Sequence, residues 1–127
     1  MITNKGRMKL VRALSPDETL NVSQLWVTND PTAPAVTDTT LEFCDGSTYD
    51  CEQLTITQTY PSGNLMYFEA VAGLDECNFI DPGTGLPVQW EKIGLVDEDG
   101  ILIATKVYTK TKDNTMQELI QFDLEVS

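Results

Sequence analysis

Residues 88–108 read VQWEKIGLVDEDGILIATKVY, two apolar runs rich in β-branched residues on either side of Asp99-Gly100. Asp and Gly tolerate the positive φ angles of the primed turns that close short hairpins. We therefore predict a β-hairpin that reverses direction at Gly100.

A second strand signal follows in residues 119–126, where apolar and polar residues alternate. The apolar positions are Ile120, Phe122, Leu124 and Val126, and the polar positions are Gln121, Asp123 and Glu125. A period of two is the pattern of a strand with one buried face. We expect this strand to join the hairpin in a three-stranded antiparallel meander.

Further strands are expected on the N-terminal side of this region. Runs suited to strands occupy 20–28, 41–43, 54–60 and 65–72, and the last two should form a hairpin around the turn 61–64. Proline and glycine mark open loops at 29–40 and 73–87. Six or seven strands separated by such turns predict a mainly β fold, an antiparallel β-sandwich with one short N-terminal helix. The length predicts a single domain, residues 1–127.

Residues 1–14 form a basic arm that we expect to be helical. The apolar residues of this arm fall near one helical face: Met8, Leu10, Val11 and Leu14. Thr3 or Asn4 is the expected N-cap, and Ser15-Pro16-Asp17 should end the helix. A helix of about three turns is marginal alone, so it should form only when it is docked on the sheet.

The charge of the chain is divided unevenly. The net charge is −12, yet half of the basic residues lie in the arm, at Lys5, Arg7, Lys9 and Arg12. An acidic chain is a poor partner for nucleic acid, whose binding depends on Lys and Arg neutralising phosphates. The arm has two interpretations: it leans on its own acidic body, or it contacts an acidic neighbour in an assembly.

No segment predicts a membrane location. No apolar run approaches the roughly 20 residues that a spanning helix needs. The first residues also lack the apolar core of a secretory signal, so we expect neither membrane insertion nor export by that route.

The residue types argue against an enzyme or a metal protein. Histidine is absent, which removes Ser-His-Asp and Cys-His catalysis and histidine-containing zinc sites. Asp97-Glu98-Asp99-Gly100 lacks the ligand spacing of a calcium loop, and Asp81-Pro82-Gly83-Thr84-Gly85 lacks the lysine of a phosphate loop. We expect a non-enzymatic protein without a cofactor or metal.

Cysteine and tryptophan leave alternatives open. Cys44 and Cys51 are close enough in sequence for a disulfide in an oxidising setting, the alternative being free thiols. Trp26 and Trp90 are candidates for stacking on a sugar, although tryptophan in an alternating strand is more often part of the core.

Four segments occur in an order that resembles a known family. They are the opening MITNKG (1–6) before the basic helix, PTAPAVTDTTLE (31–42), EKIGLVDEDGILIA (91–104), and KTKDNT (110–115) before the last strand. Together they resemble the N-terminal domain of the phage tail-collar fibre family of tailed bacteriophages. The resemblance implies a β-rich virion module, oligomeric, that joins a tail, collar or baseplate to fibre-like parts.

We therefore expect a virion structural protein, an adaptor or fibre-attachment component made in the host cytoplasm and assembled into the phage particle. Its expected partners are other virion proteins and further copies of itself. Two alternatives remain. A small acidic β-sandwich also suits a capsid decoration (cement) protein on the phage head, and Trp26 or Trp90 would serve a carbohydrate-binding module.

Overall fold

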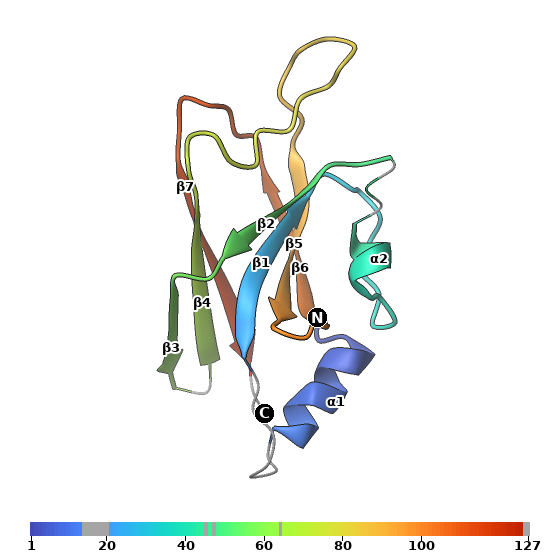
Figure 1. Ribbon diagram of the computed structural model, residues 1–127, viewed down its shortest axis with the longest axis vertical. Coiled ribbons are helices and arrows are strands. Elements are labelled where there is room, and N and C mark those ends of the chain that lie inside the picture. The colour runs from blue at the N-terminus through green and yellow to red at the C-terminus, as the bar shows by residue number, and fades with distance from the viewer. Residues whose placement is uncertain (14–20, 45, 47, 64, 126–127) are drawn as a thin grey trace.

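The computed structural model describes residues 1–13, 21–44, 46, 48–63 and 65–125, and it confirms the predicted class. Two antiparallel sheets pack face to face, with a short helix at the N-terminus (Figure 1). The first sheet has the order β2 (Cys51–Thr55), β1 (Val22–Thr28), β5 (Trp90–Asp97), β6 (Leu102–Lys110). The second has the order β3 (Gln58–Ser62), β4 (Leu65–Ala72), β7 (Glu118–Glu125).

The predicted hairpin is confirmed, but its turn differs in type. Gly100 has a φ of 78°, whereas Asp99 does not share that left-handed conformation. The Gly100 amide donates to the Asp97 carbonyl at 3.0 Å, and the Asp97 amide donates to the Ile101 carbonyl at 3.1 Å. These bonds enclose a three-residue loop with glycine in the left-handed position, rather than a two-residue primed turn.

Replacing Gly100 tests this turn. Gly100→Val should lower the free energy of unfolding by about 1–3 kcal/mol, because a β-branched residue is strained at that φ. Gly100→Asn is the matched control and should lose less, since asparagine tolerates the left-handed region. Urea unfolding followed by circular dichroism measures both; equal stability of wild type and Gly100→Val would contradict the turn.

The predicted meander is wrong in its third strand. β7 pairs with β4 in the second sheet, from Leu65 opposite Glu125 to Ala72 opposite Glu118, and not with β6. Residues 111–117 carry the chain across from one sheet to the other. Lys112 holds this crossover, because its buried Nζ donates to Asn78 Oδ1 at 2.6 Å. The alternating pattern correctly predicted a strand with one buried face. Such a strand can belong to either sheet, so the pattern did not identify its partner.

The expected strand 54–60 is divided between the sheets. β2 pairs with β1 in the first sheet, and β3 pairs with β4 in the second. The predicted hairpin survives as β3–β4. Its turn is shorter than expected, because β3 continues through Ser62; Asn64 lies outside the described residues.

The expected strand at 41–43 is wrong, because these residues belong to the short helix α2 (Thr40–Phe43). The Thr39 amide donates to Glu42 Oε2 at 3.0 Å, and the Thr39 hydroxyl also bonds this carboxylate. This is a capping box with Thr39 as the N-cap, and it favours a helix from Thr40 in place of the strand.

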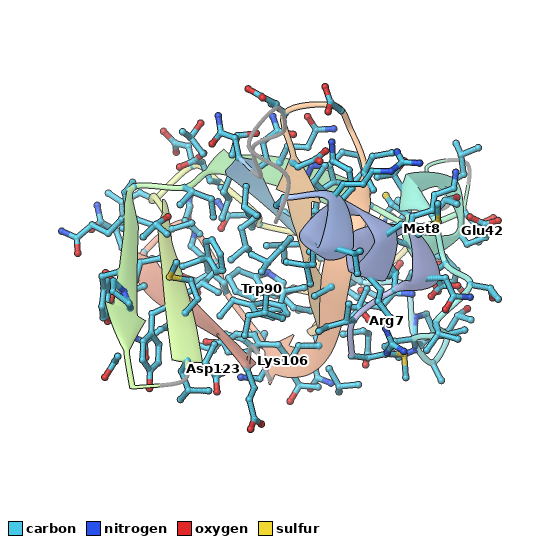
Figure 2. The ribbon with its side chains drawn as sticks, turned by 90° about the horizontal axis from the view of Figure 1, so that it is seen from below. Arg7, Met8, Glu42, Trp90, Lys106 and Asp123 are labelled. Atoms are coloured by element: carbon cyan, nitrogen blue, oxygen red, sulfur yellow. The ribbon has the colours of Figure 1, made fainter. Side chains whose placement is uncertain are left out.

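The core lies between the sheets, with Trp90 fully buried in it (Figure 2). Phe43 of α2 packs instead on the outer face of the first sheet, beside Val96 and Leu102. Both helices lie on the side of the first sheet (Figure 1). Lys106 of β6 and Asp123 of β7 link the two sheets, with Lys106 Nζ 3.1 Å from Asp123 Oδ1.

Candidate functional site

The N-terminal residues are fastened along the edge of β6. The Thr3 amide donates to the Ile103 carbonyl at 3.0 Å, and the Thr105 amide donates to the Met1 carbonyl at 2.8 Å. Thr3 is also the N-cap of α1 (Asn4–Arg12), since its Oγ1 accepts from the Gly6 amide at 2.9 Å. These bonds fix where the helix starts relative to the first sheet.

Gly6 is the point at which α1 touches the sheet. It is buried, and a Cβ built on it would lie 2.0 Å from the Ile103 carbonyl oxygen. Such a distance between helix and strand backbones admits only glycine. The helix therefore docks through a close backbone contact.

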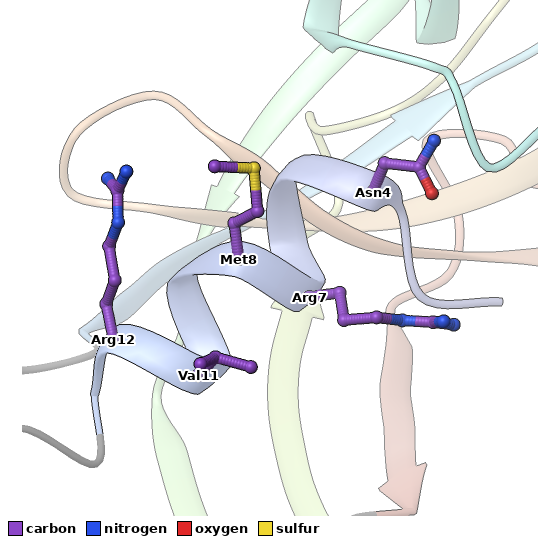
Figure 3. Close-up of a pocket in the computed structure, with 5 residues that line it drawn as sticks. All are labelled: Asn4, Arg7, Met8, Val11 and Arg12. Carbon is purple, nitrogen blue, oxygen red and sulfur yellow. The ribbon is translucent and has the colours of Figure 1, made fainter.

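α1 docks on the sheet as predicted, but the contact is not made by Met8 or Val11 of its apolar face. Met8 is 54% exposed and Val11 is 63% exposed, while Leu14 lies outside the described residues. The contact at Gly6 turns Met8 and Val11 outward. Figure 3 shows them with Asn4, Arg7 and Arg12, which together line a shallow surface depression.

The four basic residues of the arm divide into different roles. Lys9 contacts its own acidic body, with Nζ 2.7 Å from Asp99 Oδ2 and 3.3 Å from Asp97 Oδ2. The hydrogen bond to Asp99 raises the pKa of Lys9, and burial of the ammonium opposes that shift. For Lys9 the first interpretation of the arm holds.

The remaining basic residues, Lys5, Arg7 and Arg12, are exposed. Lys5 adds a small favourable field at Glu42, whose pKa is lowered mainly by its hydrogen bonds with Thr39. Within the described ranges neither Arg7 nor Arg12 forms a salt bridge. We call the exposed residues Arg7, Met8, Val11 and Arg12 the basic face.

A second surface lies where the β4–β5 and β6–β7 connections meet, and the sequence predicts only an open loop for its residues within 73–87. A cavity of about 390 Å³ is lined there by residues that include Asp75, Asn78, Ile80, Gly85, Lys112 and Asp113. The Lys112 ammonium donates to the carbonyls of Asp113 at 3.3 Å and Leu74 at 3.4 Å as well as to Asn78. Hydrogen bonds from the hydroxyl and amide of Thr115 lower the pKa of Asp113.

The three cysteines are free thiols in this structure, Cys77 buried and the other two half-buried. Burial raises the pKa of Cys51, with a hydrogen bond between the Cys51 and Cys44 thiols adding to the shift. Burial also raises the pKa of Cys77. The two thiols are close enough to hydrogen-bond but are not bonded covalently here. A disulfide between Cys44 and Cys51 under oxidising conditions therefore stays a prediction.

The raised pKa values make a testable statement about reactivity. Because the thiolate is the nucleophile, iodoacetamide at neutral pH should modify Cys51 and Cys77 far more slowly in the folded protein than in urea. Mass spectrometry of the labelled peptides measures each rate. Equal rates in the folded and unfolded protein at either residue would contradict the burial assigned to it.

The tryptophans take different positions. Trp90 belongs to the core, as its alternating strand suggested, and its Nε1 donates to the Cys77 carbonyl at 2.8 Å. Trp26 is half-buried on the outer face of the first sheet, with its ring centroid 6.5 Å from that of Phe43. Trp90 is therefore not placed to stack on a sugar.

Within the described ranges, no group of three or more Cys, Asp or Glu residues is placed to hold a metal ion. In that same part of the chain, no helix has the length and apolar character to cross a bilayer. Comparisons with family models, with curated proteins and with solved structures find no match to this chain.

Proposed function

We propose that this protein is a non-enzymatic structural component of a bacteriophage virion, an adaptor or fibre-attachment module of the tail, collar or baseplate. The observation that carries the proposal is the basic face of α1, which presents Met8 and Val11 between Arg7 and Arg12. The phage tail is named because four sequence segments occur in an order that resembles the tail-collar fibre family.

The basic face is held in place before any partner arrives. Thr3 caps the helix, Gly6 contacts the strand backbone, and Lys9 binds the carboxylates of the hairpin turn. A helix fixed in this way loses little conformational entropy on binding. Methionine and arginine are also residue types enriched at protein interfaces, where their side chains are buried against a partner.

Three of the four segments that carry the resemblance lie together around the start of this helix. The Asn4 amide donates to the Val36 carbonyl at 2.7 Å, which joins segment 1–6 to segment 31–42. Thr3 joins the first segment to Ile103 in segment 91–104. A shared sequence pattern that converges on one surface supports an attachment role for that surface.

Incorporation into particles tests the proposal. Arg7→Gln with Arg12→Gln should leave the protein folded, because both side chains are exposed, yet reduce its amount in purified phage by about tenfold or more. The reason is that the interface would lose its charged hydrogen bonds. Quantitative mass spectrometry of purified particles measures the amount.

The matched control is Lys106→Gln, which removes an exposed cation that pairs with Asp123 on another surface. Such a pair contributes little to stability, so incorporation should stay at the wild-type level. Absence of the wild-type protein from particles would overturn the proposed function. Antibody labelling of the head instead of the tail would favour the capsid decoration alternative.

A further inference from the structure

The basic face and the second surface lie at opposite ends of the molecule. The sheet pairs Ala72–Glu118 and Trp90–Lys110 mark one end, from which the connections 73–89 and 111–117 extend. At the other end α1 meets Asp97 and Asp99 of the β5–β6 turn. Figure 1 shows the helix at the bottom of the long axis and these connections at the top.

The two surfaces carry opposite charge, although the end that holds α1 also includes Asp97 and Asp99, which pair with Lys9. Residues 1–13 contain four Lys or Arg residues and no Asp or Glu, a formal +4 within a chain of −12. The rest of the chain therefore carries a formal −16, from −12 minus +4. Part of this charge lies on the end loops, where Asp75, Asp81 and Asp113 are exposed.

Both surfaces also expose apolar side chains. On the end loops Leu74 is 46% exposed, Ile80 is 52% exposed and Leu86 is 64% exposed. We call the following residues together the acidic end: Leu74, Asp75, Ile80, Asp81, Leu86 and Asp113. Each surface thus combines charges of one sign with apolar groups. The positive charges of the basic face could pair with the carboxylates of the acidic end, and the apolar groups of both could pack together.

From this complementarity we infer that copies of this chain bind one another head to tail, with the basic face of one copy on the acidic end of the next. Arginine side chains pair with carboxylates through two hydrogen bonds each, and Arg7 and Arg12 can approach Asp75 and Asp81 in this way. Met8 is flexible enough to fill the irregular cavity beside Ile80.

The charge of Lys112 does not oppose this contact strongly. Its ammonium is buried within the loops and directed to Asn78 and to two backbone carbonyls. The carboxylates of the acidic end thus remain exposed to a partner. A contact between two different surfaces is heterologous, so it generates a ring or an open row of copies.

This inference deepens the proposed function, because it names a second copy as the partner of the basic face. Sedimentation velocity of the purified full chain over a range of concentrations tests it. The wild type should associate as its concentration rises, and this should weaken when salt is raised from about 50 mM to about 500 mM. A wild type that stays monomeric at every concentration would overturn the inference.

Reversal of charge identifies the two surfaces. Arg7→Glu with Arg12→Glu should weaken association by about tenfold or more, and Asp75→Arg with Asp81→Arg should do the same. In each variant the two surfaces then carry charges of the same sign where they would meet. A mixture of the two variants should associate again, because each end then meets an end of opposite sign. Failure of the mixture to associate would overturn the pairing of these surfaces.

Circular dichroism and thermal melting establish that each variant is folded before sedimentation. Asp75→Arg alone replaces the double variant if the change at Asp81 unfolds its loop, in which the Asp81 carboxylate accepts from the Gly83 amide at 2.8 Å. Lys106→Gln serves again as the control and should associate like the wild type.

The particle experiment separates the two proposals. Loss of incorporation in the Arg7 and Arg12 variant, with a wild type that is monomeric in solution, would retain the virion role and assign the basic face to a different virion protein. Association in solution without a wild-type protein in particles would retain the head-to-tail contact and overturn the virion role.

Discussion

Gly6→Val is expected to release the N-terminal helix from the sheet. A Cβ at this position would lie 2.0 Å from the Ile103 carbonyl oxygen and 2.6 Å from the Ile103 Cα. These are backbone atoms of a paired strand, so they cannot move aside as the end of a flexible side chain can. We expect the free energy of unfolding to fall by about 3 kcal/mol, the upper part of the usual range for overpacking.

Hydrogen exchange and urea unfolding measure this effect together. The amides of α1 should lose their protection in Gly6→Val, since a helix of this length is not stable without its contact to the sheet. Gly46→Ala is the control, because a Cβ there meets no atom within 4 Å. Protected α1 amides in Gly6→Val would contradict the docking described here.

The same change should affect both proposed interactions. The basic face depends on Gly6 for its orientation, although Gly6 itself is buried beneath the helix. Gly6→Val should therefore reduce both incorporation into particles and association in solution, although none of the residues of the basic face is substituted.

Trp90→Ala is expected to cause the largest loss of stability, about 3–5 kcal/mol. The indole is fully buried between the sheets, and its centroid lies 6.1 Å from the ring of Tyr108. Its removal leaves a cavity and also leaves the Cys77 carbonyl without the donor that now lies 2.8 Å away.

Trp26→Ala is the matched comparison, because Trp26 is half-buried on the outer face of the first sheet and its Nε1 bonds Gln24 at 3.0 Å. It should lose clearly less stability, since less apolar surface returns to water. Urea unfolding followed by far-ultraviolet circular dichroism suits both variants, because the backbone supplies most of that signal. Equal losses would contradict the placement of Trp90 in the core.

Local patterns predicted much of the fold. The β5–β6 hairpin, the β3–β4 hairpin and the alternating strand β7 all follow from residue period and turn residues. Period alone does not say which of two sheets a strand joins. The crossover at 111–117 depends on Lys112 reaching Asn78, a contact between residues that are distant in sequence.

The candidate site was harder to predict for the same kind of reason. The sequence predicted that the helix docks on the sheet, but the pattern of Met8 and Val11 did not show which residue makes the contact. The decisive contact is the approach of Gly6 to Ile103. An isolated glycine in a helix lowers helix propensity by about 1 kcal/mol relative to alanine and often has a packing role, which was the signal available in the sequence.

The pairing of individual charges could not be predicted from the sequence. The sequence predicted a basic arm and an acidic body, but not that Lys9 would bind Asp97 and Asp99 while Arg7 and Arg12 stayed exposed. Nor could it bring Asp75 and Asp113 together, since they come from different connections of the sandwich.

The pairing of residues 1–3 with β6 has a consequence for the behaviour of the protein at high concentration. The Ile103 carbonyl and the Thr105 amide already have partners in Thr3 and Met1, so this stretch of the sheet border has no vacant groups for the backbone of another molecule. Unpaired borders are the places where β proteins extend into fibrillar aggregates. Pairing with residues 1–3 therefore removes this stretch of β6 as a place where the backbone of another molecule could add.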